Sequence, residues 1–195
     1  MTTFVFPDNT VLINFTVLGR HDIVEWFTLG QGRWTESVWQ ECGRSARYEG
    51  LAEMKSWGSI FGEPLRPTPA ELINAANIAD GMRKPGERSN HRKHMGEAET
   101  IAIIESRFSN IEGHAGRSIF LTDDHDAEDR AARRGIKVFT TADILAFAEI
   151  KGRITHAQAR QYLAALLNDG HGVGRKAKDY DALVNDYRKR WQGGS

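Results

Sequence analysis

The sequence predicts an α/β fold with a parallel sheet, and three features of the chain support this prediction. Short apolar runs bounded by turn residues are typical of buried strands. Stretches with helical spacing of apolar residues follow these runs, which is the alternation expected of crossover connections. Hydrophobic residues make up 40% of the 195 residues, enough for the core of one domain, or of one domain with an appendage.

The first part of the chain opens with this alternation. Residues 3–6 form a short apolar run that Pro7 closes, as expected for a buried strand. The polar side chains of Asp8 and Thr10 can cap a following helix, which Gly19 ends. The predicted elements up to residue 44 are a strand over 3–6, helices over 11–18 and 23–29, a candidate strand over 33–34 and a helix over 36–44.

The pattern changes between residues 45 and 95. Two helical stretches are predicted there, over 51–61 and 69–82, with prolines between them. Residues 83–94 carry five Lys or Arg, two His and a single Glu, without apolar periodicity. We interpret this last segment as a mobile loop.

Strands and helices alternate again after residue 95. Gly135 and Gly152 end two of the predicted helices, and Thr140 and Thr155 can cap the helices that come next. The predicted elements are a helix over 97–108, strands over 118–121 and 137–139, and helices over 127–132, 144–150, 155–167 and 180–191.

Charge, cysteine content and hydropathy restrict the location and partners of the protein. The formal net charge is zero, but residues 151–195 carry nine Lys or Arg against four Asp or Glu. A basic tail on an acidic body suits contact with a phosphate backbone, and it equally suits a solvated helix. The single cysteine, Cys42, excludes a disulfide framework, and no apolar run approaches the roughly 18 residues of a membrane span. We expect a soluble, cytoplasmic protein with no membrane partner.

Four acidic residues lie where a predicted strand ends or a predicted helix runs: Asp8, Glu41, Glu97 and Asp124. In a parallel α/β fold such positions meet at one edge of the sheet. Carboxylates gathered there repel one another unless a cation joins them. Oxygen ligands of this kind suit Mg²⁺ or Mn²⁺, so the sequence predicts a metal site.

Each of these acids also has a purely structural explanation. Asp8 and Asp124 can be helix caps, and Glu97 in a first turn gains from the helix dipole. Glu41 can belong to a solvated helix face. The metal-site interpretation rests on a shared feature of the four acids. Each of them comes after an element that should end at the same edge of the sheet.

Several segments resemble motifs of the PIN-domain family, in particular its VapC-like toxin members. DNTVLIN at 8–14 resembles the opening motif, and GEAETIA at 96–102 resembles the third motif in its glutamate-rich form. The fourth motif and its following strand are similar to LTDD at 121–124 with AARRGIKV at 131–138, and residues 142–154 are similar to the closing helix. The resemblance covers roughly residues 3–44 and 95–155, and it rests on the order and spacing of the motifs.

The resemblance implies a three-layer α/β/α sandwich with a central, mainly parallel sheet. It also implies an Mg²⁺- or Mn²⁺-dependent endoribonuclease that cleaves single-stranded RNA, often a toxin held by a cognate antitoxin, and it makes a homodimer an expectation. The catalytic set carried over is Asp8, Glu41, Glu97 and Asp124. Asp8 and Asp124 are expected as direct metal ligands, and Glu41 and Glu97 as ligands through water or to a second ion. The other residues carried over are the second-choice metal ligands Glu99 and Asp123 and the polar supports Thr10, Asn14 and Thr122.

The chain departs from the family pattern in three places. Asn9 stands where Ser or Thr usually follows the first Asp. Residues 45–95 are longer than the usual helical segment between the second and third motifs, and the tail after 155 is extended. We therefore expect a nuclease domain over 1–155 with a helical insertion at 45–95, and a basic helical extension over 156–195.

The basic segment offers candidates for contact with RNA phosphates, single-stranded or in structured RNA. These contacts would be salt-dependent and blind to sequence. The alternative is a solubilising loop. The candidates are Arg83, Lys84, Arg88, Arg92 and Lys93.

Histidines near the predicted site have weaker claims. His91 and His94 could bind metal or donate a proton, but we expect them to be exposed in a polar loop. His125 is closer to the acids, because it follows Asp124 directly.

Two other functions remain open from the sequence. One is a structure-specific DNase that uses the same ions, since no reader of the 2′-hydroxyl group is evident. The other is a non-catalytic module that keeps the fold to bind RNA or protein. The complete acid set argues against the second.

Overall fold

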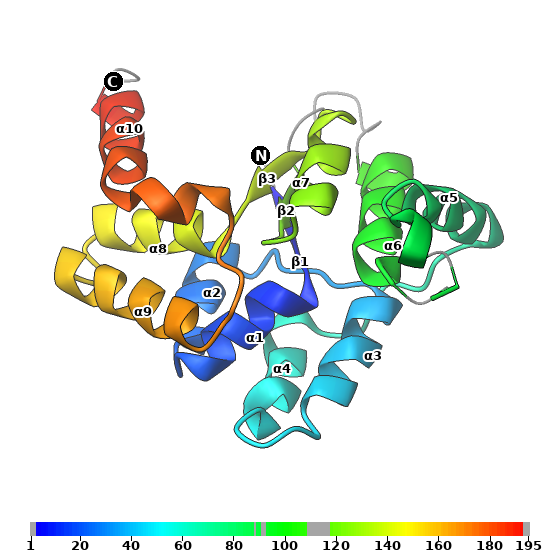
Figure 1. Ribbon diagram of the computed structural model, residues 1–195, viewed down its shortest axis with the longest axis horizontal. Helices are drawn as coiled ribbons and strands as arrows, with labels where there is room; N and C mark the ends of the chain where they lie inside the picture. Colours follow the sequence, from blue (N-terminus) through cyan, green and yellow to red (C-terminus); the bar gives the residue numbers. More distant parts are fainter. Residues whose placement is uncertain (1–2, 88, 91–92, 109–117, 193–195) are drawn as a thin grey trace.

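The computed structural model describes residues 3–87, 89–90, 93–108 and 118–192, and it has a mixed α/β architecture (Figure 1). Three short strands form a parallel sheet in the order β1-β2-β3, so β2 is central. The strands are β1 (Phe4–Pro7), β2 (Ser118–Leu121) and β3 (Lys137–Phe139). The parallel sheet predicted from strand–helix alternation is confirmed, although it is small.

The register of the sheet places alternate side chains on opposite faces. Phe6 pairs with Phe120, and both belong to one buried hydrophobic cluster. Their neighbours Val5, Leu121 and Phe139 belong to a second cluster. Because adjacent side chains of a strand point to opposite faces, the sheet separates two cores. Both faces are buried, as parallel sheets require.

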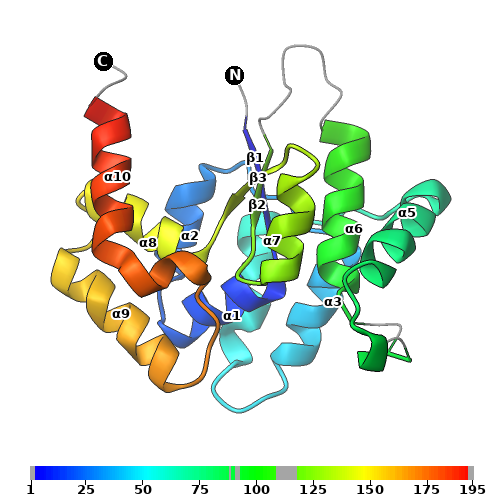
Figure 2. The same ribbon diagram turned by 45° about the horizontal axis from the view of Figure 1, so that its top comes forward.

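Helices cover both faces of the sheet (Figure 2). The cluster that contains Val5 is built with α1 (Asn9–Val17), α2 (His21–Thr28), α3 (Glu36–Ser45), α8 (Thr141–Ile150), α9 (His156–Asn168) and α10 (Tyr180–Gln192). The cluster that contains Phe6 is built with α5 (Pro69–Asp80), α6 (Met95–Ile103) and α7 (His125–Ala132). The long connection from β1 to β2 therefore contributes helices to both sides.

The candidate strand over 33–34 does not form. Instead, Gly32 makes an isolated parallel bridge to Val5 beside β1, with Arg33 donating its backbone N–H to the Val5 carbonyl at 2.9 Å. The chain then leaves the sheet, because Thr35 bridges to Leu65 and begins α3. Pairing over one residue is too short for a strand.

The segment between residues 45 and 95 also differs from its prediction. In place of a helix over 51–61 there is a 3₁₀ helix, η1 (Ala52–Trp57), followed by the short α4 (Gly58–Phe61). The helix predicted over 69–82 is α5, whose first turn has a capping box between Thr68 and Glu71.

The basic loop expected over 83–94 has more structure than its composition indicated. It contains a short 3₁₀ helix, η2 (Pro85–Glu87), and its first and last residues, Arg83 and His94, are buried. Helix α6 then begins at Met95 and continues into a π-helical turn, η3 (Ile104–Phe108).

The C-terminal extension packs into the body of the protein. After the 3₁₀ helix η4 (Arg175–Asp179), α10 lies against α8. Tyr180 and Val184 join the same buried cluster as Val5. The Tyr187 hydroxyl donates to Asp143 at 2.6 Å, and the Tyr180 hydroxyl donates to Glu149 at 3.1 Å. Among the described residues, none of the helices is both long and apolar enough to cross a membrane.

The contact between Tyr187 and Asp143 predicts a stability change. Asp143 is fully buried, so Tyr187→Phe removes the hydrogen-bond donor of one Asp143 carboxylate oxygen. We expect the free energy of unfolding, measured by urea titration, to fall by about 1–2 kcal/mol. Lys189→Ala, an exposed change on the same helix, should alter it by less than about 0.5 kcal/mol. Equal effects of the two variants would contradict this assignment.

Candidate metal centre

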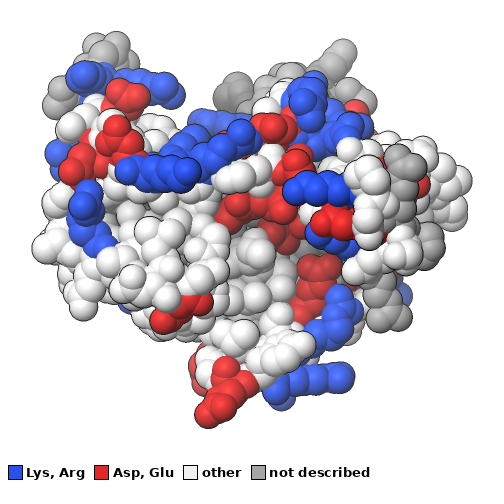
Figure 3. All heavy atoms as spheres, in the orientation of Figure 1, with Lys and Arg blue, Asp and Glu red and all other residues white. Residues whose placement is uncertain are grey.

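The predicted acids come from four separate segments around the carboxyl ends of β1 and β2. Asp8 follows β1 and is the N-cap of α1. Asp124 follows β2 and caps α7, accepting the Ala127 backbone N–H at 2.8 Å. Glu97 lies in the first turn of α6, and Glu41 lies on α3. In Figure 3, acidic side chains gather at the centre of this face of the molecule.

Asp8 is buried, and its orientation is fixed by local hydrogen bonds. Its carboxylate accepts the Asn9 backbone N–H at 2.6 Å and the Thr10 hydroxyl. Burial raises the pKa of Asp8 well above its ordinary value, and the nearby charges of Glu97 and Glu41 raise it further. Asp8 therefore shares one pocket with two other predicted acids.

Glu41 reaches this pocket from α3 and packs against the backbone of Gly96. A Cβ atom at Gly96 would lie 2.8 Å from the Glu41 Oε2 atom, so only glycine leaves room for the carboxylate. Burial raises the pKa of Glu41 to about 7, with a further contribution from the charge of Glu97. Arg44, whose guanidinium lies 3.9 Å from Glu41, partly opposes this rise.

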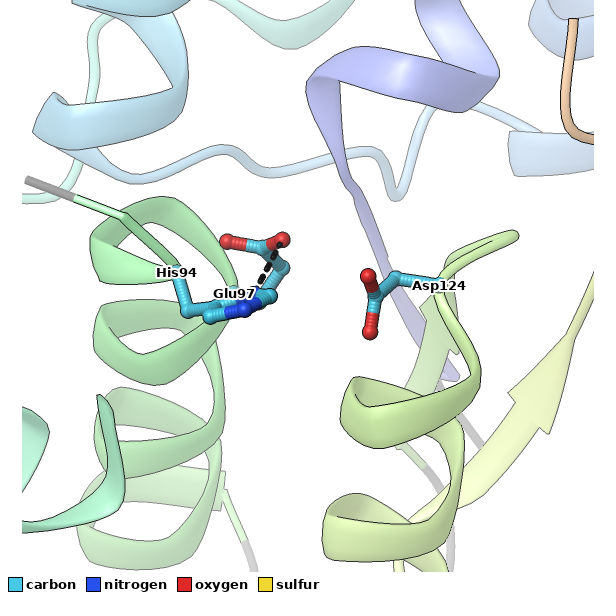
Figure 4. A group of neighbouring side chains, drawn as sticks. All are labelled: His94, Glu97 and Asp124. Carbon is cyan, nitrogen blue, oxygen red and sulfur yellow. Dashed lines mark hydrogen bonds and ion pairs between the residues drawn. The ribbon is translucent and has the colours of Figure 1, made fainter. Parts of the chain in front are cut away.

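Glu97, His94 and Asp124 form a group that could hold a metal ion. One ligand atom from each of the three lies within 4.8 Å of the others. The His94 Nδ1 atom is 3.4 Å from Glu97 Oε1, and Asp124 faces this pair from the loop after β2 (Figure 4). The hydrogen bond to Glu97 raises the pKa of His94 despite its burial.

Glu97 connects the two halves of the site. It raises the pKa of Asp8 and of Glu41, and it lies in the group with His94 and Asp124. Only His94, Glu97 and Asp124 have ligand atoms that close together among the described residues, and Asp8 and Glu41 lie beside them, within reach of the charge of Glu97. We call these five residues together the acidic pocket (Asp8, Glu41, Glu97, Asp124 and His94).

The donor set of the acidic pocket fits a divalent cation. Asp8 and Glu41, whose pKa values are raised by burial and by the charge of Glu97, are destabilised as anions, and a cation among these acids would relieve that repulsion. Several carboxylate oxygens match the preference of Mg²⁺ and Mn²⁺ for oxygen ligands, and one imidazole is acceptable to softer ions of this series.

The second-choice ligands have structural roles instead. Glu99 accepts the backbone N–H and the hydroxyl of Ser37 at 3.0 and 2.7 Å, and it thereby caps the start of α3. Asp123 accepts the backbone N–H and hydroxyl of Thr141 at the start of α8, at 2.8 and 2.5 Å. These partners direct Glu99 and Asp123 away from a metal-binding role.

Two of the three predicted polar supports contact acids of the acidic pocket, and the third contacts Asp123. Thr10 contacts Asp8, and the Thr122 hydroxyl accepts the backbone N–H of Asp124 at 3.2 Å. Asn14 instead donates to Asp123 at 3.0 Å and to the Gly172 carbonyl at 2.7 Å. Thr10 and Thr122 thus support the acidic pocket, whereas Asn14 joins α1 to the Asp123 network.

The basic segment is less available for RNA than the sequence indicated. The buried Arg83 forms an ion pair with Asp80, and Lys93 forms one with Glu87. Lys84 is exposed. The remaining candidates, Arg88 and Arg92, lie outside the described residues, as does His91.

Sequence reasoning placed His94 wrongly and left His125 undecided. We expected His94 to be exposed in a polar loop, but it is buried against Glu97. The available signal was its position three residues before Glu97 at a helix start, a spacing that puts two side chains on one face. The His125 side chain is 54% exposed and lies 4.0 Å from Glu128.

No protein-family model matches this chain, and neither a curated protein nor a solved structure shows a match. Its function must therefore be inferred from the chemistry of the acidic pocket.

The raised pKa of Glu41 predicts a pH dependence of stability. A carboxyl whose pKa rises from 4.5 to about 7 on folding contributes stability below pH 4.5 that is lost as the pH passes about 7. In metal-free protein at about pH 8, Glu41→Gln should therefore raise the free energy of unfolding by roughly 1–3 kcal/mol, with little effect at about pH 4.5. Urea titrations in EDTA test this. A variant effect that does not change with pH would contradict the assignment.

The contact between Gly96 and Glu41 predicts a loss of metal affinity without unfolding. In Gly96→Ala the new Cβ displaces only the flexible end of Glu41, so the melting temperature should change little. Calorimetry with Mn²⁺ should show affinity reduced by about tenfold or more. Gly43→Ala on α3, where an added Cβ meets nothing within 4 Å, is the matched control and should bind as the wild type does. Unchanged affinity in Gly96→Ala would remove Glu41 from the site.

Proposed function

We propose that this protein is a metal-dependent endoribonuclease of PIN-like, three-layer α/β/α architecture that hydrolyses phosphodiesters of single-stranded RNA. The observation that carries the proposal is the group of His94, Glu97 and Asp124, which could hold a metal ion, with Asp8 and Glu41 within reach of the charge of Glu97. These residues come from four separate segments of the chain, after β1, on α3, at the start of α6 and after β2. Helices on both faces of a parallel sheet are consistent with the architecture.

The residues of the acidic pocket would bind the ion in different ways, directly or through water. Asp8, Glu97 and Asp124 would bind Mg²⁺ or Mn²⁺, with Glu41 binding through water or to a second ion. When bound, such an ion orients the attacking water, lowers its pKa and neutralises charge on the phosphate. Thr10 and the Asn9 backbone N–H hold the Asp8 carboxylate in place, and Thr122 holds the turn that presents Asp124.

The reaction would be a simple hydrolysis. The water oxygen adds to phosphorus, and the bond from phosphorus to the leaving ribose oxygen breaks. The leaving oxygen takes a proton from solvent water, so the products are one phosphomonoester and one hydroxyl group. His94 is close to the acids, but its hydrogen bond to Glu97 gives it an orienting role in this scheme.

The biological setting follows from the motif resemblance. It supports a cytoplasmic toxin held by a cognate antitoxin protein, and a homodimer as the assembled form. The basic C-terminal helix and the helical segment over 45–95 distinguish this chain from the usual pattern, and α10 and α5 lie at the outside of the fold in Figure 1.

Removal of one acid tests the proposal. In Asp8→Asn the amide keeps the cap of α1 but loses the charge that a cation needs. We expect Mn²⁺-dependent cleavage of a single-stranded RNA oligonucleotide to fall by about a hundredfold or more. Asp126→Asn, an exposed acid in the first turn of α7, is the control and should retain activity.

The assay needs two further arms. EDTA should abolish cleavage by the wild type, and a DNA oligonucleotide of identical sequence should be cut more slowly if RNA is the substrate. Undiminished cleavage by Asp8→Asn would overturn the assignment of the site.

A further inference from the structure

An open groove lies beside the acidic pocket, on a neighbouring face of α3. Its volume is about 470 Å³, which is within the range of ligand sites in proteins. Buried apolar side chains, Trp34, Cys42 and Met54, form its floor. Its rim carries larger and more polar side chains from α3 and η1. We call it the Trp39 groove, after its most exposed aromatic residue.

Trp39 is placed to offer its ring to a ligand. Trp39 is 46% exposed, so part of its ring is available to a ligand. Gly43 lies one turn further along α3 on the same face, and an added Cβ there would meet nothing within 4 Å. The surface next to Trp39 is therefore open.

The charged residues of the groove are all cations. Arg44, Arg47 and Lys55 line it, and the described lining contains no acidic residue. Within the part of the chain that the structure describes, the side chains of Arg47 and Lys55 have no ion-pair partner. Basic side chains adjoin the acidic centre over α3 in Figure 3. An anionic ligand complements this set.

Arg44 joins the Trp39 groove to the acidic pocket. It lines the groove, and its guanidinium lies 3.9 Å from Glu41. A chain that carried phosphates along α3 would therefore reach the acids without leaving cationic surface. A single-stranded polynucleotide fits this surface, because it carries flat bases that can stack on an aromatic ring and phosphates that can contact the cations.

We propose that the Trp39 groove is a subsite for single-stranded polynucleotide, in which a base stacks on Trp39 while Arg47 and Lys55 contact phosphates. The inference rests on the proposed function, since it seats a nucleotide flanking the bond to be cut. Stacking on an aromatic face tolerates every base, and phosphate contacts carry no sequence information. The subsite thus provides affinity and position without sequence preference.

Binding measured without cleavage tests the subsite apart from catalysis. The probe is a fluorescent RNA of about 12 nucleotides, and its anisotropy is followed in EDTA with full-length protein. Trp39→Ala should weaken binding by about five- to 150-fold, and Trp39→Phe should retain most of the affinity. Trp191→Ala, which removes an equally exposed tryptophan on α10, is the matched control and should bind as the wild type does.

A separate measurement tests the phosphate contacts of Arg47 and Lys55. It remains valid if Trp39→Ala folds poorly. The double variant Arg47→Gln/Lys55→Gln should reduce the slope of log affinity against log salt by about 1.4. Arg133→Gln, an exposed cation just after α7, is its control and should leave the slope unchanged. A DNA oligonucleotide of the same sequence should depend on Trp39 to the same extent, because stacking does not read the sugar.

The outcomes separate this subsite from the nuclease activity. Cleavage by the wild type with Mn²⁺, together with equal RNA binding by wild type and Trp39→Ala, would overturn the subsite and leave the nuclease standing. Trp39-dependent binding without any cleavage would support the subsite and overturn the nuclease. Failure of the wild type to bind either oligonucleotide, or an equal loss in Trp191→Ala, would also overturn the subsite.

Discussion

The repulsion among buried carboxylates is the constraint on which the rest of this structure depends. Burial makes Asp8 and Glu41 harder to ionise, and the negative charge of Glu97 beside them adds to this effect. A fold selected for stability alone would not gather these groups. The surrounding structure has to hold them by other means.

Those means are the strand pairing and the helix caps around the pocket. Pro7 of β1 lies beside Leu121 of β2, and the Asp8 backbone N–H donates to the Leu121 carbonyl at 2.8 Å. This pairing fixes where the two following loops emerge. Glu99, held by Ser37, ties α6 to the start of α3, which brings Glu41 toward Glu97. Glu99, an acid with a structural role, thus helps to position Glu41 and Glu97.

Much of this arrangement could be predicted from the sequence. The positions of Asp8 and Asp124 follow from the ends of two apolar runs, because parallel strands share one carboxyl edge. The choice between Glu97 and Glu99 could not be made in this way. Two residues apart on a helix, they point to different sides, and only the tertiary partner Ser37 shows which one is structural.

The segment over 83–94 shows that composition alone does not predict which polar side chains are buried. Its charge and lack of apolar period indicate a solvated loop, yet Arg83 and His94 are buried, each beside an acid three residues away and just outside the segment. Composition reports average exposure, and a polar side chain can be buried wherever a partner satisfies it. The candidate strand over 33–34 was wrong for a related reason, since a two-residue run has no periodicity to test and only a single bridge forms, at Gly32.

The contacts of α8 with the last part of the chain affect how the protein is made. Asp143 is fully buried and relies on Lys176 and Tyr187, and Glu149 relies on Tyr180 and Arg188. All four partners are synthesised after α8. During translation these contacts can form only after residues 176–188 have left the ribosome. The packing around α8 is therefore completed later than the synthesis of α8 itself.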